Sequence, residues 1–130
     1  MEPELKEFAK LLVQLVRDEA IQNSDFSLSS QARGPTARRW QQAATHQSPL
    51  EFARTIIPDI VDETVFYLLN AIDNGSLKLT FATQNGTQVD LTKDGHGELA
   101  GWYLGSDGWR AAYSKERFVD DFPTSGDATS

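Results

Sequence analysis

The sequence contains no cysteine, a single methionine and no apolar run long enough to span a membrane. The lack of cysteine excludes disulfides, zinc–thiolate sites and thiol nucleophiles together. The N-terminus, MEPELKEFAK, lacks the basic segment and apolar run of a signal peptide. These absences predict a soluble cytoplasmic protein of bacterial type that needs no membrane partner.

Basic residues are also scarce, since 12 of them face 19 acidic residues and give a net charge of −7. A field of that sign repels a phosphate backbone and therefore disfavours nucleic-acid binding. The length of 130 residues fits one domain. We expect that domain to span residues 1–122, followed by a flexible polar tail at 123–130, PTSGDATS.

The N-terminal third of the chain has helical periodicity. A first helix is predicted from Pro3 to about Gln22, with Ser24 to Pro35 as a long connection after it. A short helix capped by Thr36 is expected over Ala37 to Ala44, with Trp40 on its apolar side. The apolar stripe of the first helix comprises Leu5, Phe8, Leu12, Leu15 and Val16.

The clearest local signal is the capping box Ser48-Pro49-Leu50-Glu51, which predicts the start of a helix. Pro58 is expected to break or kink this helix, because proline has no N–H group and clashes with the preceding turn. A further helix from Pro58 should end at Gly75, where glycine can adopt the left-handed conformation.

From Ser76 onward the period changes to alternation, which predicts strands. A three-residue loop, Gln84-Asn85-Gly86, keeps the apolar side chains on one face by pairing Phe81 with Val89. The same parity predicts a strand ending at Leu104, with Trp102 inward, and a strand from Trp109 to Tyr113. For Trp109 to Phe118, a helix beginning near Ser106 is the alternative.

The resulting fold class is α+β with two layers. The N-terminal helices should pack on one face of a roughly four-stranded antiparallel meander, and a short C-terminal helix should cover Lys115 to Asp121. Trp102, Trp109 and Tyr113 would then form a wall of the core, while Tyr103 and Arg110 would lie on the outer face of the sheet.

Motifs for catalysis are absent. Asp94, His96 and Glu98 alternate like metal ligands, but KDGHGE is better explained as a turn. Asp59, Asp62 and Glu63 share one side of a helix and are expected to form a solvated face. We therefore predict no metal, no cofactor and no catalytic residue, and favour a protein that is not an enzyme.

Arginines beside aromatic residues are the candidate binding groups, because guanidinium forks suit carboxylate or phosphate and stack on aromatic rings. The interpretation is a non-catalytic binding domain with a protein partner, or a homodimer, of the bacterial accessory kind. A small anionic ligand is a second option, in a binding or enzymatic pocket between helices and sheet under the 24–35 loop. The alternative role for these arginines is to neutralise carboxylates within the chain. The candidate ligand-binding residues are Arg33, Arg38, Arg39, Trp40, Tyr103 and Arg110.

Overall fold

The computed structural model describes residues 1–121, so the predicted tail at 123–130 lies outside the described residues. The chain begins with a continuous helix made of α1 (Pro3–Leu12), one π-helical stretch η1 (Val13–Arg17) and α2 (Asp18–Ser27). The predicted first helix is therefore confirmed and extends five residues beyond the expected end, to Ser27. The long connection predicted from Ser24 to Pro35 shrinks to residues 28–34, since α2 continues to Ser27 and α3 begins at Pro35.

The second helix, α3, spans Pro35–His46 and carries Trp40, which is only 1% exposed. Its N-cap is Gly34, and no side chain caps it, so the predicted cap by Thr36 is wrong. Pro35 at the first helical position is what sets the start, because its φ is already helical and its missing N–H is not needed there.

The longest helix, α4 (Pro49–Asp73), begins at the predicted cap, where the Ser48 side chain accepts a hydrogen bond from the Glu51 amide. The predicted break at Pro58 is wrong, since the helix continues through it. Proline there leaves the carbonyl of Arg54 without its helical donor. Arg117 supplies the donor instead, with Nη2 2.8 Å from that carbonyl oxygen.

The helix end and the hairpin follow the sequence expectations. Gly75 has a φ of 80° directly after the C-cap of α4. The strands β1 (Thr80–Ala82) and β2 (Gln88–Asp90) pair antiparallel with Phe81 opposite Val89. Gly86 has a φ of 91°, as the bulged three-residue loop requires.

The four-stranded meander is contradicted, because these two strands form the only sheet among the described residues. Three short helices follow instead: α5 (Leu91–Asp94), α6 (Leu99–Leu104) and α7 (Trp109–Tyr113). Asp90 starts α5 by accepting from the Lys93 amide. Asp73 starts α6 by accepting from the amides of Leu99 and Ala100, at 2.9 and 3.0 Å.

The expected aromatic wall of a sheet is wrong for the same reason. Trp102 and Trp109 lie on α6 and α7, are each 39% exposed, and have ring centroids 6.0 Å apart. Arg110, expected on an outer face, is buried. The helix predicted over Lys115 to Asp121 does not form, and residues 114–121 run without regular secondary structure.

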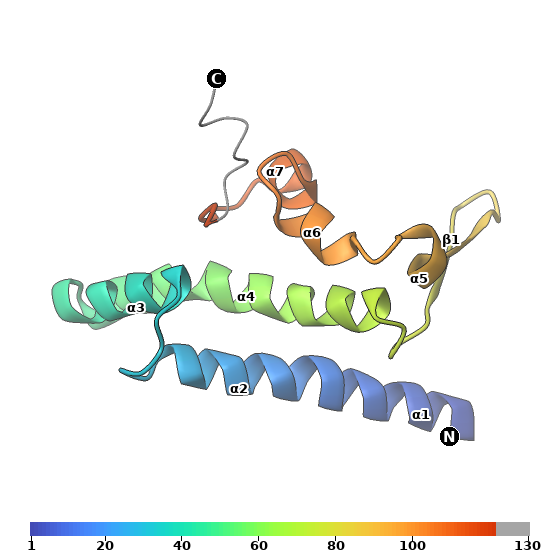
Figure 1. The fold of residues 1–130 in the computed structure, drawn as a ribbon, viewed down its shortest axis with the longest axis horizontal. Coiled ribbons are helices and arrows are strands. Elements are labelled where there is room, and N and C mark those ends of the chain that lie inside the picture. The colour runs from blue at the N-terminus through green and yellow to red at the C-terminus, as the bar shows by residue number, and fades with distance from the viewer. Residues whose placement is uncertain (122–130) are drawn as a thin grey trace.

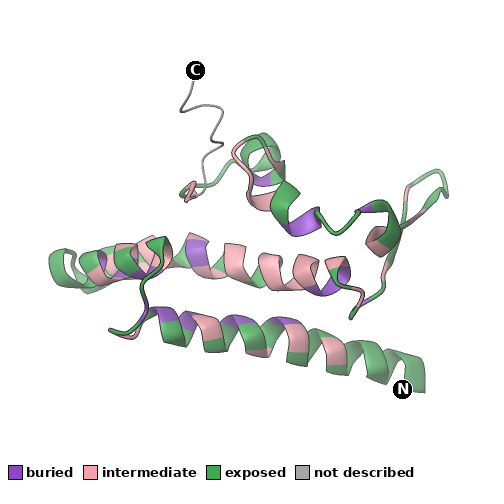
Figure 2. Ribbon diagram, viewed as in Figure 1, coloured by how far each residue is buried: buried purple, intermediate pink, exposed green. Residues whose placement is uncertain are grey.

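The architecture is helical, with α4 in the middle (Figure 1). The N-terminal helix runs antiparallel to α4 on one side, and α6 and α7 lie on the other side. Figure 2 shows that the buried positions gather where these helices face each other. The buried cluster comprises Ala71, Ile72, Leu77 and Leu99, with Leu11, Leu15, Leu68 and Leu69 packed against it.

Candidate functional site

Two carboxylates of α4, Asp59 and Asp62, organise the polar part of the molecule. The sequence predicted a solvated face for them, but Asp59 is buried and Asp62 is largely buried. Their spacing of three residues places both on the side of α4 that faces the C-terminal segment. Each carboxylate holds one arginine and one aromatic side chain, so neither is a free acid or base.

The Asp59 centre joins α3 to α4. Arg39 contacts Asp59 with two nitrogens, at 2.9 and 3.2 Å, and Trp40 Nε1 donates to the same carboxylate at 2.6 Å. Arg39 also donates to Asp121 at 2.7 and 3.1 Å, which ties the C-terminal segment to the helices. These hydrogen bonds, with Asp121 first, raise the pKa of Arg39 against the effect of its burial.

The Asp62 centre joins α6 and α7 to α4. Tyr103 Oη and Arg110 Nη1 each donate to Asp62 at 2.7 Å. The guanidinium of Arg110 also lies 4.2 Å from the ring centroid of Phe118, a cation–π distance. Burial, together with the hydrogen bond to Asp62, raises the pKa of Tyr103 to about 12.

A small polar cavity of about 180 Å³ lies on one side of the Asp62–Arg110 pair. Four carboxylates line it, Asp59, Asp62, Glu63 and Asp121, together with Arg110. Burial and the nearby charge of Asp59 raise the pKa of Glu63. The volume is below the range of roughly 300–1,000 Å³ that is typical of small-molecule pockets.

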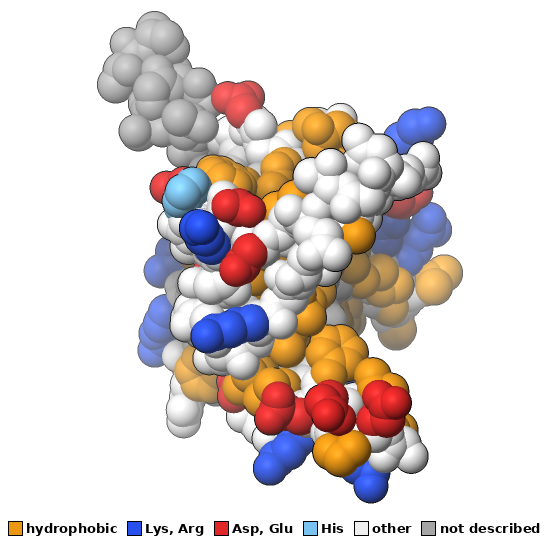
Figure 3. Space-filling model, turned by 90° about the vertical axis from the view of Figure 1, so that its right-hand side faces the viewer, with side chains coloured by type: hydrophobic (Ala, Val, Ile, Leu, Met, Phe, Trp, Pro, Cys, Tyr) orange, Lys and Arg blue, Asp and Glu red, His pale blue; other side chains and the backbone are white. Residues whose placement is uncertain are grey.

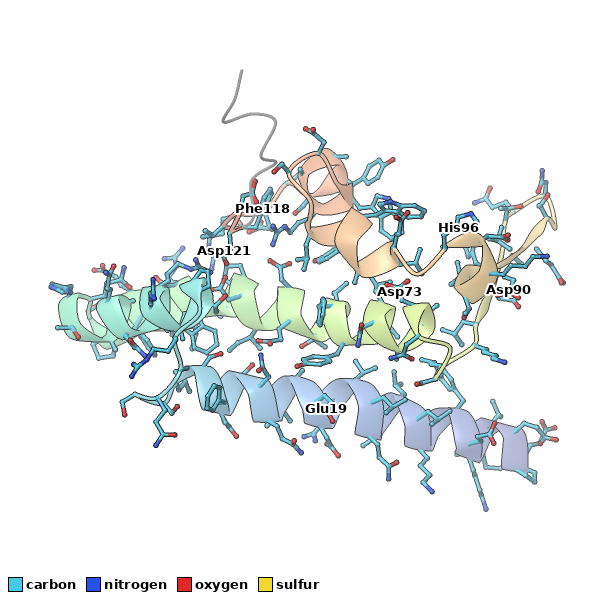
Figure 4. All side chains as sticks on the ribbon, in the orientation of Figure 1. Glu19, Asp73, Asp90, His96, Phe118 and Asp121 are labelled. Atoms are coloured by element: carbon cyan, nitrogen blue, oxygen red, sulfur yellow. The ribbon has the colours of Figure 1, made fainter. Side chains whose placement is uncertain are left out.

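An open apolar groove of about 550 Å³ lies on the other side of the same pair. Its floor is α4, and its walls are α6, α7 and the segment that follows. The predominantly apolar lining includes Ile57, Pro58, Val61, Tyr103, Trp109, Tyr113 and Phe118. Figure 4 places Phe118 and Asp121 above α4, where the C-terminal segment passes α3.

The six predicted ligand-binding residues separate into three groups. Arg39 and Trp40 meet at Asp59, and Tyr103 and Arg110 meet at Asp62. Arg33 is exposed and contacts only the Ser30 carbonyl among the described residues, at 3.4 Å, and Arg38 is exposed on α3. The acidic partners and the apolar groove residues were missed. The i, i+3 pair Asp59 and Asp62 after Pro58 was the available signal, but dipole complementarity explained it equally well.

Within residues 1–121, no group of three histidine, cysteine, aspartate or glutamate side chains could hold a metal ion. Asp94 is the last residue of α5, and His96 and Glu98 belong to the connection between α5 and α6, where His96 has a φ of 53°. Figure 4 shows His96 on that connection, beyond the C-terminal end of α4.

Comparison with known proteins identifies no relative of this chain. No family model matches the chain, and neither a curated protein nor a solved structure shows significant similarity to it. In the part of the chain that the structure describes, no helix combines the length and apolarity that crossing a bilayer requires.

Proposed function

We propose that the protein is a non-catalytic binding domain whose apolar groove accepts a segment of a protein partner. The observation that carries this proposal is the groove itself, which exposes Ile57, Val61, Trp109 and Tyr113 beside one another. Tyr113 is the most exposed of the four, at 80%. Aromatic residues in such positions are typical of the energetic centres of protein interfaces.

Charge favours a partner segment that carries carboxylates. Arg117 lines the groove and pairs with the exposed Glu116, which also lines it, at 3.6 Å. Arg54 lines the neighbouring pocket with Pro58, and Lys115 is exposed, so three basic residues outnumber Glu116 here. This local excess of positive charge stands out in a chain of net charge −7. An amphipathic segment with large apolar side chains and acidic residues would therefore complement both properties of the groove.

The second option, a small-ligand pocket under a lid, has less support. The residues expected to form the start of that lid belong to α2, and the polar cavity beside them holds only about 180 Å³. The two candidate arginines nearby are already paired, Arg39 with Asp59 and Asp121, and Arg110 with Asp62. These pairs favour the intramolecular role for Arg39 and Arg110 over binding of an external anion.

The test uses two synthetic peptides with the same leucine and tryptophan pattern, one with glutamate and one with lysine at the polar positions. The three tryptophans of the ¹⁵N-labelled protein provide three indole N–H signals for NMR. We expect the glutamate peptide to shift the signals of Trp109 and its neighbour Trp102. The signal of Trp40 should stay in place, because Trp40 is buried against Asp59.

Val61→Glu should abolish these shifts by placing a charge on the groove floor. Phe81→Glu is the matched control, since Phe81 is similarly exposed but lies on the hairpin. The proposal fails if neither peptide shifts Trp109, or if both substitutions act alike. Equal binding of the lysine peptide would overturn the acidic part of the proposal.

A further inference from the structure

The polar cavity of about 180 Å³ beside the Asp62–Arg110 pair is lined by three polar side chains that the fold leaves without a partner. Asn23 and Ser27 lie four residues apart on one face of α2, and Glu63 lies on α4. Within residues 1–121, none of the three side chains forms a hydrogen bond or an ion pair. Ser27 is only 8% exposed, so its hydroxyl depends on whatever occupies the cavity.

The charges around the cavity favour a cation as the occupant. The lining carries four carboxylates, whereas only two arginines pair with them, Arg39 and Arg110. Glu63 is the carboxylate left without a cation. Nε of Arg110 also lacks a partner, but protein atoms enclose it, so it does not open to the cavity.

Glu63 differs from the acidic residues on the open surface of the protein. Figure 3 shows acidic side chains open to solvent at the end of the molecule where the N-terminus lies. Water screens a cation from carboxylates of that kind, so such contacts contribute little. Glu63 is half-buried, and burial together with the charge of Asp59 raises its pKa. A cation in the cavity would compensate this negative charge, which nothing within residues 1–121 does.

The acceptors and the size of the cavity favour a primary ammonium group over a metal ion. No group of three metal-ligating side chains in the described part of the chain could hold a metal ion. A primary ammonium group has three N–H donors, and the cavity offers a carboxylate, a hydroxyl and an amide carbonyl as acceptors. Cavities of about 150 Å³ accommodate a molecule the size of benzene, so a short alkylamine fits here. The apolar part of the lining, which suits an alkyl chain, comprises Phe66, Leu104 and Val119.

We propose that this cavity binds a small primary alkylammonium ion, whose N–H groups donate to Glu63, Ser27 and Asn23. The site lies across the Asp62–Arg110 pair from the apolar groove, so it does not depend on the binding of a partner segment there. Its preference for a cation is opposite to that of the anionic ligand expected from the arginines.

The test uses three probes with the same number of non-hydrogen atoms: n-butylammonium chloride, tetramethylammonium chloride and 1-butanol. In the ¹⁵N-labelled protein the reporters are the side-chain amide of Asn23 and the indole of Trp40, which donates to Asp59 in the cavity lining. We expect butylammonium to shift both signals and the other two probes to bind about tenfold more weakly or less. Trp109, in the apolar groove, should not shift, which separates this result from peptide binding. The proposal fails if butylammonium shifts neither reporter, or if either of the other probes binds equally well.

Two serines of α2 provide a matched pair of variants. Ser24 and Ser27 are each 8% exposed and lack a partner for the hydroxyl, but Ser24 lines a different groove, between the N-terminal helix and α4. Ser27→Ala should weaken butylammonium binding about fivefold, the effect of one hydrogen bond, and Ser24→Ala should leave it unchanged. Neither substitution should lower the free energy of unfolding in urea, because neither hydroxyl has a hydrogen bond to lose. Equal effects of the two substitutions on binding would overturn the assignment of Ser27.

Glu63→Gln tests the charge of the site. The substitution retains the shape of the side chain and removes its negative charge, so butylammonium should bind about tenfold more weakly or less. Circular dichroism should show an unchanged helical signal. Unchanged binding by this variant would overturn the proposal.

Discussion

The two sides of α4 are held by different kinds of interaction. On one side, Asp59, Asp62 and Asp73 anchor α3, α6 and α7 through hydrogen bonds and ion pairs. On the other side, the long N-terminal helix packs through apolar side chains such as Leu11 and Leu15. Helices of five or six residues are unstable alone and gain little apolar area, so they need directional anchors. The N-terminal helix, which runs from Pro3 to Ser27, is long enough to be held by apolar packing.

The largest test of this comparison removes the anchor at the junction of α3 and α4. Asp59→Ala leaves Arg39 with Asp121 alone and leaves the buried Trp40 indole N–H without its acceptor. Removing one member of a buried ion pair costs about 3 kcal/mol or more. Urea unfolding followed by circular dichroism measures the loss in the free energy of unfolding.

The matched control is Asp18→Ala on the other side of the molecule. Asp18 pairs with Arg17 at 3.2 Å in an exposed position, and such pairs contribute about 0.5 kcal/mol or less. The comparison between the two sides breaks if Asp59→Ala destabilises the protein no more than Asp18→Ala does.

The sequence separation between an element and the residues that stabilise it explains which elements could be predicted. The starts of the helices at Pro3 and Ser48, the stop at Gly75 and the hairpin register all depend on residues within a few positions. Local sequence therefore contained the information, and those predictions are confirmed.

The elements that could not be predicted depend on distant contacts. The amides that open α6 bond to Asp73, 26 positions earlier, and the continuity of α4 through Pro58 uses Arg117, far later in the chain. Short segments such as Leu99–Leu104 fit both helical and alternating spacing, so periodicity could not decide between them. For the same reason the pairing of Arg110 with Asp62, 48 positions apart in the sequence, could not be predicted.

An intermediate effect is expected from Tyr103→Phe, which removes one donor to Asp62 and retains the ring. The loss at neutral pH should be about 1 kcal/mol. Because the folded state raises the pKa of Tyr103 from 10 to about 12, the unfolded chain releases this proton first as pH rises. The stabilisation is complete below pH 10 and declines between about pH 10 and 12.

Urea unfolding of the wild type and Tyr103→Phe across this alkaline range checks the sign. The substituted protein should lose less stability between pH 10 and 12 than the wild type does, so the gap between them narrows. Ultraviolet difference absorbance should show one fewer late-titrating phenol in the variant. If the variant instead loses a phenol that titrates at the ordinary pH, the Asp62 centre does not hold Tyr103.

The smallest effect, and the opposite sign, is expected at Glu63, which lies beside the two anchors without serving as one. Burial and the charge of Asp59 raise its pKa, so the folded state holds this proton more tightly than the unfolded chain does. Ionisation of Glu63 therefore costs stability once the pH rises above its ordinary value of 4.5. Glu63→Gln should raise the melting temperature slightly at neutral pH, and the gain should vanish in acid.

The control is Glu98→Gln at an exposed position, which should leave the melting temperature unchanged both at neutral pH and in acid. A lower melting temperature for Glu63→Gln at neutral pH would mean that Glu63 is itself an anchor, and the polar side of α4 would then hold four carboxylates in that role.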